Sequence, residues 1–320
     1  MLFRSIVQVA GLSKRYRGSG VPALDNVSFS VDEGEIFGLI GADGAGKTTA
    51  FQILAGVMEA SGGQVEVFGQ SPRTSRDLVG YLTQRFSLYQ DLSVAENLRF
   101  SAGLRQVPEA DLASRGQRYL EAFDLERFRG RLAGRLSGGM KQKLALSCAL
   151  VSSPRLLILD EPTTGVDPVS RRDFWDTLAD LAAEGMTILV ATPYLDEAER
   201  CHRVALMERG KIYQVDAPAA FRAKLGWTRL QVKPPNLAQA EAALAGAAVE
   251  DVQRFGDRLD ILVRDEEAGR RAVAERLGAV ETAAATPTLE NAFVATLRRM
   301  RGAEHRPPFP GRTDRKSTRL

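Results

Sequence analysis

The feature that most constrains the fold is a glycine-rich stretch, GADGAGKTT, at residues 41–49. An apolar run that resembles a strand, EIFGLI (35–40), precedes it, and a helical pattern from about Lys47 to Met58 follows it. Glycines let such a loop bend so that its backbone N–H groups point at phosphate oxygens, and the helix adds its positive N-terminal end. The spacing G-x-x-x-x-G-K-T therefore predicts a strand–loop–helix unit that binds the phosphates of a nucleotide.

Two side chains of this loop have specific expected roles. Lys47 is expected to reach the β and γ phosphates, and Thr48 to bind Mg²⁺. The expected nucleotide-binding residues are those of the whole loop: Gly41, Ala42, Asp43, Gly44, Ala45, Gly46, Lys47, Thr48 and Thr49. A chance glycine-rich turn is the alternative, which the flanking strand and helix disfavour. A dinucleotide-binding loop would need G-x-G-x-x-G, which this loop does not supply.

A second apolar run, LLILDE (156–161), ends in two acids. Continuous apolar runs are typical of parallel strands covered on both faces, and ligands bind at the carboxyl edge of such sheets. Asp160 is therefore expected to hold Mg²⁺, directly or through water, and Glu161 to orient and polarise an attacking water. Two surface acids after a buried strand are the simpler alternative, which the phosphate-binding loop disfavours.

Composition and charge narrow the class of protein. The chain has 320 residues, enough for one large domain and a smaller one, and 44% of them are apolar. Its net charge of +3 is too small to indicate a nucleic-acid partner. No apolar run approaches the roughly 18 residues of a membrane span, and the N-terminus does not resemble a signal peptide. Cys148 and Cys201 lack metal-type spacing and are expected to be reduced, in helices of a cytosolic protein.

The order of the apolar patterns predicts an α/β fold with a helical insertion. The pattern is helical from about 93 to 151, and strands return at LLILD and at TILVAT (187–192), which a helix over 170–183 connects. A predicted hairpin, VALMERGKIYQVD, closes this region. The expected fold is a P-loop NTPase core with an antiparallel β subdomain and an inserted α-helical subdomain at about 91–150.

The pattern of residues changes near Phe221–Trp227, and this change predicts a second, smaller unit. Residues 1–222 are expected to form the nucleotide-binding domain, and residues 223–301 an accessory α+β domain. Residues 302–320 are rich in proline and arginine and are expected to be disordered. The last seven residues, DRKSTRL (314–320), match the translation of a common sequencing adapter. This match predicts that the natural protein continues differently after residue 313.

A further stretch, LSGGMKQK (136–143), resembles the signature sequence of ATP-binding cassette (ABC) ATPases, and the resemblance covers about residues 5–222. In that family the signature of one cassette closes over ATP bound by another. Ser137, Gly138 and Gly139 are therefore expected to contact the ATP of a second cassette, in a homodimer, a separate subunit or a fused half. An ordinary N-cap for a helix at roughly 140–151 is the alternative for Ser137.

The resemblance assigns roles to three further positions. Tyr16 matches the aromatic residue that stacks on adenine, and Gln84, in GYLTQ, matches the glutamine that links Mg²⁺ and the attacking water to the transporter subunit. Asp167, in GVD (165–167), matches the loop that crosses the dimer interface. ATP and Mg²⁺ are thus the implied cofactors. Glu161 and Gln84 are the implied catalytic pair, and the implied Mg²⁺ residues are Thr48, Gln84 and Asp160.

The resemblance also implies a cellular role. TLENAF (288–293) is similar to the stretch that ends many exporter cassettes. The chain is therefore expected to be the ATPase subunit or half of an exporter, on the cytoplasmic face of the cell membrane, driving a separate membrane-spanning permease subunit. Two alternatives stay open: a non-transport ABC ATPase in the cytosol, and a regulatory cassette that only binds ATP. The insertion lacks sustained heptads, which counts against DNA-repair types.

One position departs from the family pattern. TPYLDEA (192–198) matches T-H-x-x-x-E-A, so Pro193 occupies the place of the switch histidine, which donates a hydrogen bond to the γ-phosphate. Proline lacks any such donor, but its φ suits the first turn of a helix, and LDEAERC is expected to continue that helix. Losing one donor aimed at developing charge costs ~10²–10³ in rate. The sequence thus predicts a slow site paired with a competent one, unless Gln84 and Glu161 suffice.

The two histidines are not expected to replace the missing donor. His202 lies about 14 Å further along a helix, at ~1.5 Å per residue, and is expected to be a surface or interface residue. His305 lies in the tail.

Overall fold

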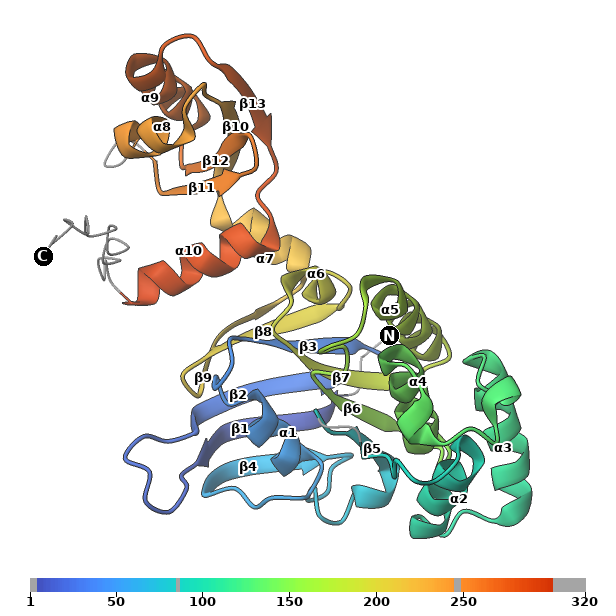
Figure 1. Ribbon diagram of the computed structural model, residues 1–320. Coiled ribbons are helices and arrows are strands. Elements are labelled where there is room, and N and C mark those ends of the chain that lie inside the picture. The colour runs from blue at the N-terminus through green and yellow to red at the C-terminus, as the bar shows by residue number, and fades with distance from the viewer. Residues whose placement is uncertain (1–4, 85–86, 245–248, 302–320) are drawn as a thin grey trace, which may run out of the picture. The chain divides into compact units, whose positions relative to one another are not determined.

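The computed structural model describes residues 5–84, 87–244 and 249–301 (Figure 1). The predicted tail, with its proposed adapter-derived end and His305, lies outside the described residues. Contacts within the chain divide it into two compact units, residues 1–220 and 221–320.

The first unit is built on a six-stranded sheet whose strand order is β5-β6-β7-β3-β8-β9. The first five strands are parallel, and β9 pairs antiparallel with β8 as the predicted hairpin. Every residue of β3, β6 and β7 is buried, as expected of parallel strands covered on both faces. The six strands are β3 (Ile36–Ile40), β5 (Val79–Leu82), β6 (Leu156–Asp160), β7 (Thr187–Thr192), β8 (Arg203–Glu208) and β9 (Lys211–Asp216).

A second, antiparallel sheet completes the core of this unit. Its order is β2-β1-β4, with β1 (Ser5–Lys14), β2 (Leu24–Asp32) and β4 (Gly62–Val67). Helix α1 (Lys47–Leu54) buries Phe51 and Leu54 in a single apolar cluster with residues of both sheets. The helix ends earlier than predicted, because Gly56 turns the chain with φ +67 and a Cβ there would lie 2.5 Å from the Pro72 carbonyl oxygen.

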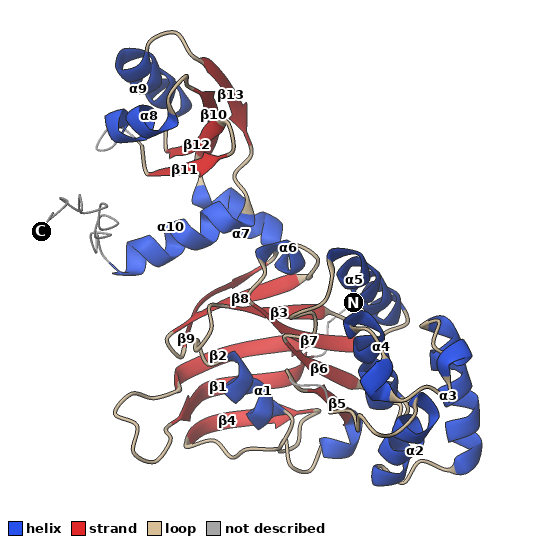
Figure 2. Ribbon diagram, viewed as in Figure 1, coloured by secondary structure: helices blue, strands red, loops and turns tan. Residues whose placement is uncertain are grey.

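Four further helices of this unit follow β5 and β6 along the chain. Helices α2 (Val94–Leu104), α3 (Glu109–Ala122) and α4 (Gly138–Leu150) form the inserted helical part, at one end of the sheet in Figure 2. Ser93 and Glu96 begin α2 with a capping box. Helix α5 (Pro168–Ala183) connects β6 to β7. Among the helices of the described ranges, none combines the length and apolarity needed to cross a bilayer.

The second unit contains a βαββαβ arrangement. Its antiparallel sheet has the order β11-β12-β10-β13, which is ferredoxin-like. Helices α8 and α9 contribute Ala240, Leu244 and Val273 to one core with the strands. The elements are β10 (Thr228–Lys233), α8 (Leu237–Leu244), β11 (Asp251–Phe255), β12 (Arg258–Val263), α9 (Glu266–Leu277) and β13 (Glu281–Ala285). Helix α7 (Pro218–Leu225) precedes this arrangement, and α10 (Leu289–Arg301) follows it. The predicted α/β class with a small C-terminal α+β part is confirmed.

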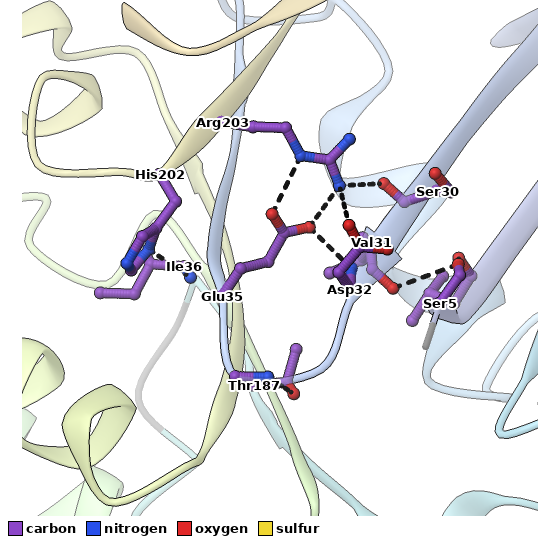
Figure 3. A network of polar contacts seen from close by, with 11 residues as sticks. Ser5, Ser30, Val31, Asp32, Glu35, Ile36, Thr187, His202 and Arg203 are labelled. Atoms are coloured by element: carbon purple, nitrogen blue, oxygen red, sulfur yellow. Dashed lines mark hydrogen bonds and ion pairs between the residues drawn. The ribbon is translucent and has the colours of Figure 1, made fainter. Parts of the chain in front are cut away.

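A polar network joins the start of β3 to β8 and β2 (Figure 3). Arg203 donates to both carboxylate oxygens of Glu35, at 2.6 and 3.0 Å, and to the Ser30 carbonyl oxygen at 3.1 Å. Glu35 also accepts from the Asp32 backbone N–H at 2.8 Å. The carboxylate of Glu35 is largely buried, so its charge depends on these donors.

We expect Arg203→Met to lower the free energy of unfolding by about 1–3 kcal/mol, because Glu35 would keep a buried charge without its cation. Urea unfolding followed by circular dichroism measures the loss. Arg118→Met is the matched control: the Arg118–Glu184 pair is exposed, so its loss should cost at most about 1 kcal/mol. Equal losses in the two variants would contradict the assignment.

Candidate active site

The phosphate-binding loop lies between β3 and α1, as the sequence predicts. Two of its glycines have no room for a side chain. A Cβ at Gly41 would lie 2.2 Å from the Met207 carbonyl oxygen, and one at Gly46 would lie 2.6 Å from the Ala23 carbonyl oxygen. Gly46 also has φ +110 and is the N-cap of α1, so the loop enters the helix through a conformation that other residues rarely adopt.

Three side chains meet beside this loop. The Lys47 ammonium lies 3.1 Å from Glu161 Oε1 and donates to the carbonyl oxygens of Gly41 and Ala42 at 2.8 and 3.1 Å. Gln84 Nε2 donates to Glu161 Oε2 at 2.9 Å. Lys47 is 3% exposed and Glu161 8%, so this ion pair is buried.

All three side chains line a pocket of about 240 Å³ that the loop also lines. Backbone N–H groups at the start of α1 and the Lys47 ammonium offer this pocket donors that suit a phosphate. The pocket is lined by Ala23, Asp43, Gly44, Gly46, Lys47, Thr48, Thr49, Gln84 and Glu161.

Asp160 is a buried acid whose carboxylate oxygens accept no hydrogen bonds from the residues that the structure describes. Its side chain is 1% exposed, and neither carboxylate oxygen has a hydrogen-bond partner among the described residues. Burial raises the pKa of this carboxyl above its usual range, and the nearby Glu161 raises it further, whereas Thr48 lowers it. A buried carboxylate without donors, beside a threonine hydroxyl, suits a divalent cation with oxygen ligands.

Glu161 has an unusual backbone. Its φ is +49, a conformation that is costly for a residue with a side chain. The Glu161 backbone N–H donates to the Ala191 carbonyl oxygen at 2.9 Å, which ties it to the end of β7. The sharp turn directs its carboxylate to Lys47 and Gln84.

Tyr16 lies beside the phosphate-binding helix. Its hydroxyl is 3.2 Å from Thr49 Oγ1, and the side chain is 43% exposed. Its ring is therefore partly open to solvent next to the loop, which leaves it able to stack on a flat ligand.

The signature residues lie elsewhere on the unit. Ser137 is the N-cap of α4 and accepts from the Met140 backbone N–H at 3.3 Å, so the helix begins at Gly138 and not near 140 as predicted. The N-cap alternative is thus correct as local structure. Ser137, Gly138 and Gly139 are absent from the lining of the phosphate-loop pocket. A Cβ at Gly139 would lie 2.5 Å from Ser170 Oγ, which places the signature against the start of α5.

The interface-loop candidate, Asp167, caps that same helix. Its Oδ1 accepts from the backbone N–H groups of Val169 and Ser170 at 3.1 and 2.9 Å. The pKa of the exposed Asp167 carboxyl lies below its usual range, chiefly because of a hydrogen bond from the Ser170 side chain and further because of these backbone bonds. Helix α5 therefore starts at Pro168, two residues earlier than predicted, because aspartate and proline together favour a helix start.

Pro193 does not begin a helix, contrary to the sequence expectation. Helix α6 spans only Leu195–Ala198, with Tyr194 as N-cap, so Pro193 precedes the cap. The Tyr194 backbone N–H donates to Thr192 Oγ1 at 3.0 Å. The Tyr194 N–H therefore has an acceptor in the Thr192 side chain, although no described residue of α6 accepts it.

His202 and the two cysteines complete the sequence candidates. His202 Nδ1 accepts from the Ile36 backbone N–H at 2.9 Å, at the start of β3 and thus at the end opposite the phosphate-binding loop (Figure 3). It is exposed, as predicted. Cys148 and Cys201 are both free thiols, but only Cys148 lies in a helix.

Sequence reasoning did not single out a buried cluster around Glu197. This carboxylate, 2% exposed, accepts from Thr163 and Thr192 and lies near Arg171. Ala23 was also missed, although it lines the pocket. The only hint of Glu197 in the sequence is that an acid lies in the TPYLDEA stretch. Thr163 and Arg171, which contact it, lie far from it in the sequence.

Comparison with known proteins gives consistent results. The family described as ABC transporter matches residues 24–164. The chain is 39% identical over 301 residues to the probable multidrug ABC transporter ATP-binding protein YbhF of Escherichia coli, covering 92% of this chain and 52% of that protein.

Two further matches cover most of the compared protein. The chain is 37% identical over 262 residues to the Nod factor export ATP-binding protein I of Burkholderia thailandensis, covering 80% of this chain and 85% of that one. A solved structure of an ATP-binding subunit of an ABC transporter superposes with a TM-score of 0.63 at 32% identity. It covers 69% of this chain and 94% of that one.

We expect Lys47→Ala to lower the free energy of unfolding by about 1–3 kcal/mol, because Glu161 would keep a buried charge without its cation. Adding Glu161→Gln should restore most of that loss, since the glutamine is neutral and can still contact Gln84. Urea unfolding without nucleotide measures both variants. A double variant no more stable than Lys47→Ala would show that the ion pair does not contribute.

Proposed function

The chain belongs to the ABC transporter family of ATPases, and we propose that it is the ATP-hydrolysing subunit, or half-subunit, of an exporter. The observation that carries this proposal is the buried ion pair of Lys47 and Glu161, joined by Gln84, beside the phosphate-binding loop. Lys47 and Glu161 line one pocket, where they would serve as the cation that binds phosphate and the acid that polarises water. The chain spans about half the length of YbhF. What the whole protein does is therefore also part of what we propose.

Lys47 is the residue that would change partners when ATP binds. A triphosphate in the pocket offers the ammonium stronger charge than the single Glu161 carboxylate, so Lys47 would bind the phosphates. Glu161 would then keep only its bond from Gln84 and could accept a proton from a water molecule. Tyr16 would stack on the adenine, and the N–H groups of residues 41–49 would hold the phosphates.

Asp160, Thr48 and Gln84 are the residues that would hold Mg²⁺. The two unpartnered carboxylate oxygens of Asp160 support this assignment. When bound, Mg²⁺ would neutralise charge on the transferred phosphoryl group.

A second cassette would complete the site. The N-terminus of α4, with Ser137, Gly138 and Gly139, suits an anion but lies outside the lining of this chain's own phosphate pocket. We therefore propose that it meets ATP held by another cassette, with Asp167 at the interface. That cassette is a second copy, a separate subunit or a fused half.

A groove beside β5 supports a membrane-spanning partner. This groove of about 270 Å³ is lined by residues of β5, α2 and α4. Its apolar residues include Tyr89, 52% exposed, Phe100, 38% exposed, and Leu104, 70% exposed. The two rings are in edge contact with centroids 4.5 Å apart. Exposed apolar clusters of this kind mark interaction sites, and this one follows Gln84 along the chain.

The relatives support export as the direction of transport. YbhF is named as a probable multidrug transporter protein, and the Burkholderia relative as a Nod factor exporter. We propose that this chain works at the cytoplasmic face of the cell membrane, with residues 1–222 as the cassette and 223–301 as an accessory domain. No nucleic-acid partner is part of this proposal.

Pro193 makes this chain's own site slow in this proposal. Proline offers no donor to the γ-phosphate, and the neighbouring Tyr194 backbone N–H is already bound to Thr192 Oγ1. A partner site that retains the histidine would supply fast turnover.

We expect the purified chain to bind ATP–Mg²⁺ but to hydrolyse it slowly, and Pro193→His to raise turnover by at most ~10²-fold, because it restores one donor. Steady-state phosphate release at saturating ATP measures the wild type, Pro193→His and Glu161→Gln, and calorimetry measures ATP binding to Lys47→Ala. Brisk wild-type hydrolysis that Glu161→Gln abolishes and Pro193→His does not increase would refute the slow site. Unchanged ATP affinity in Lys47→Ala would refute the nucleotide site itself.

We expect Tyr89→Asp with Phe100→Asp to abolish co-purification with a membrane-spanning protein from detergent-solubilised membranes of the source cells. Charges in the apolar groove would oppose docking. ATP affinity should stay within about twofold, because the groove is separate from the phosphate pocket. Val21→Asp, at an exposed apolar residue outside the groove, is the matched control. Equal co-purification of all three proteins would exclude this groove as the docking site.

A further inference from the structure

The buried carboxylate of Glu197 has no role in the mechanism above, yet it joins three segments of the site. It accepts from Thr163 Oγ1 at 2.5 Å and from Thr192 Oγ1 at 2.6 Å. All three side chains are at most 2% exposed. Hydrogen bonds from hydroxyls to a buried carboxylate are strong, and the loss of either donor leaves charge unsatisfied.

The two threonines belong to the turns on which the proposed chemistry depends. Thr163 follows Glu161 by two residues, and the Thr164 backbone N–H donates to the Glu161 carbonyl oxygen at 3.2 Å. Thr192 ends β7 and immediately precedes Pro193. Glu197 therefore holds the turn after Glu161 against the end of β7.

Arg171 adds the first turn of α5 to the cluster. Its guanidinium nitrogens lie 3.8 Å from Glu197 Oε1 and 2.8 Å from Asp196 Oδ2. The guanidinium carbon also lies over the Tyr194 ring, 5.2 Å from the ring centroid. Asp167 caps the same helix one turn earlier. The cluster thus contacts the interface loop, the turn after Glu161 and the segment around Pro193.

We infer that Glu197 is a positioning residue for ATP hydrolysis, acting through Thr163 on the turn that presents Glu161. This inference rests on the proposed role of Glu161 as the acid that polarises water. Glu161 has φ +49, and such a backbone persists only where its surroundings hold it. The Thr163–Glu197 bond is one of the contacts that hold it, because it fixes the chain two residues after Glu161.

Thr163→Val tests this bond, since valine keeps the shape and removes the hydroxyl. We expect kcat for ATP hydrolysis to fall about 10- to 100-fold, with ATP affinity changed less than about twofold. Thr163→Ser, which keeps the hydroxyl, should restore most of the lost kcat. Glu197→Gln should also lower kcat, and the double variant Thr163→Val with Glu197→Gln should lose no more than the worse single variant, because both act through one contact.

A second readout does not require turnover. Amide hydrogen exchange at Glu161 and Thr164 should be at least about tenfold faster in Thr163→Val than in the wild type. Glu35→Gln is the matched control, because Glu35 is also a largely buried carboxylate but lies at the start of β3, at the opposite end of the sheet. It should lower stability while leaving kcat and the exchange of these two amides unchanged.

The outcomes separate the two proposals. Wild-type kcat and wild-type exchange at Glu161 and Thr164 in Thr163→Val would overturn the role of Glu197. Equal effects of Thr163→Val and Glu35→Gln on exchange would also overturn it, because they would indicate general destabilisation. Hydrolysis that survives Glu161→Gln would instead overturn the proposed function, and the exchange result would still decide whether Glu197 holds the turn.

Discussion

The ion pair between Lys47 and Glu161 is the interaction on which the site depends. Each charge is almost fully buried, so neither could lie there without the other or a ligand to replace it. The pair requires that the ends of β3 and β6 lie close together, with only β7 between them. Parallel pairing supplies this geometry, and the Arg203–Glu35 pair joins β8 to the start of β3 at the opposite end of the sheet. One charge pair stabilises the sheet, and the other is available for chemistry.

Features set by local spacing could be predicted from the sequence. The loop at 41–49 and the acids at 160–161 were predicted because a strand end and a helix start can be recognised within a few residues. That residue 193 offers no side-chain donor could be read from the sequence, because this is a property of proline itself.

Features set by contacts between distant segments could not be predicted. The pairing of Glu197 with Thr163 and Thr192 requires the fold of the whole unit. In the second unit, Arg229 bonds to the buried Asp260 at 3.2 Å, a pairing that depends on the register of β10 with β12.

The close packing of Gly139 against Ser170 has a consequence for specificity. No side chain fits at position 139 without displacing the start of α5, so residues 137–139 and the Asp167 loop lie packed together at one edge of the unit. Any chain that docks on this edge must match both parts in a single register, since neither can adjust alone. A cassette of the wrong shape would therefore be rejected at two places at once, and discrimination between paired cassettes would arise from backbone spacing as much as from charge.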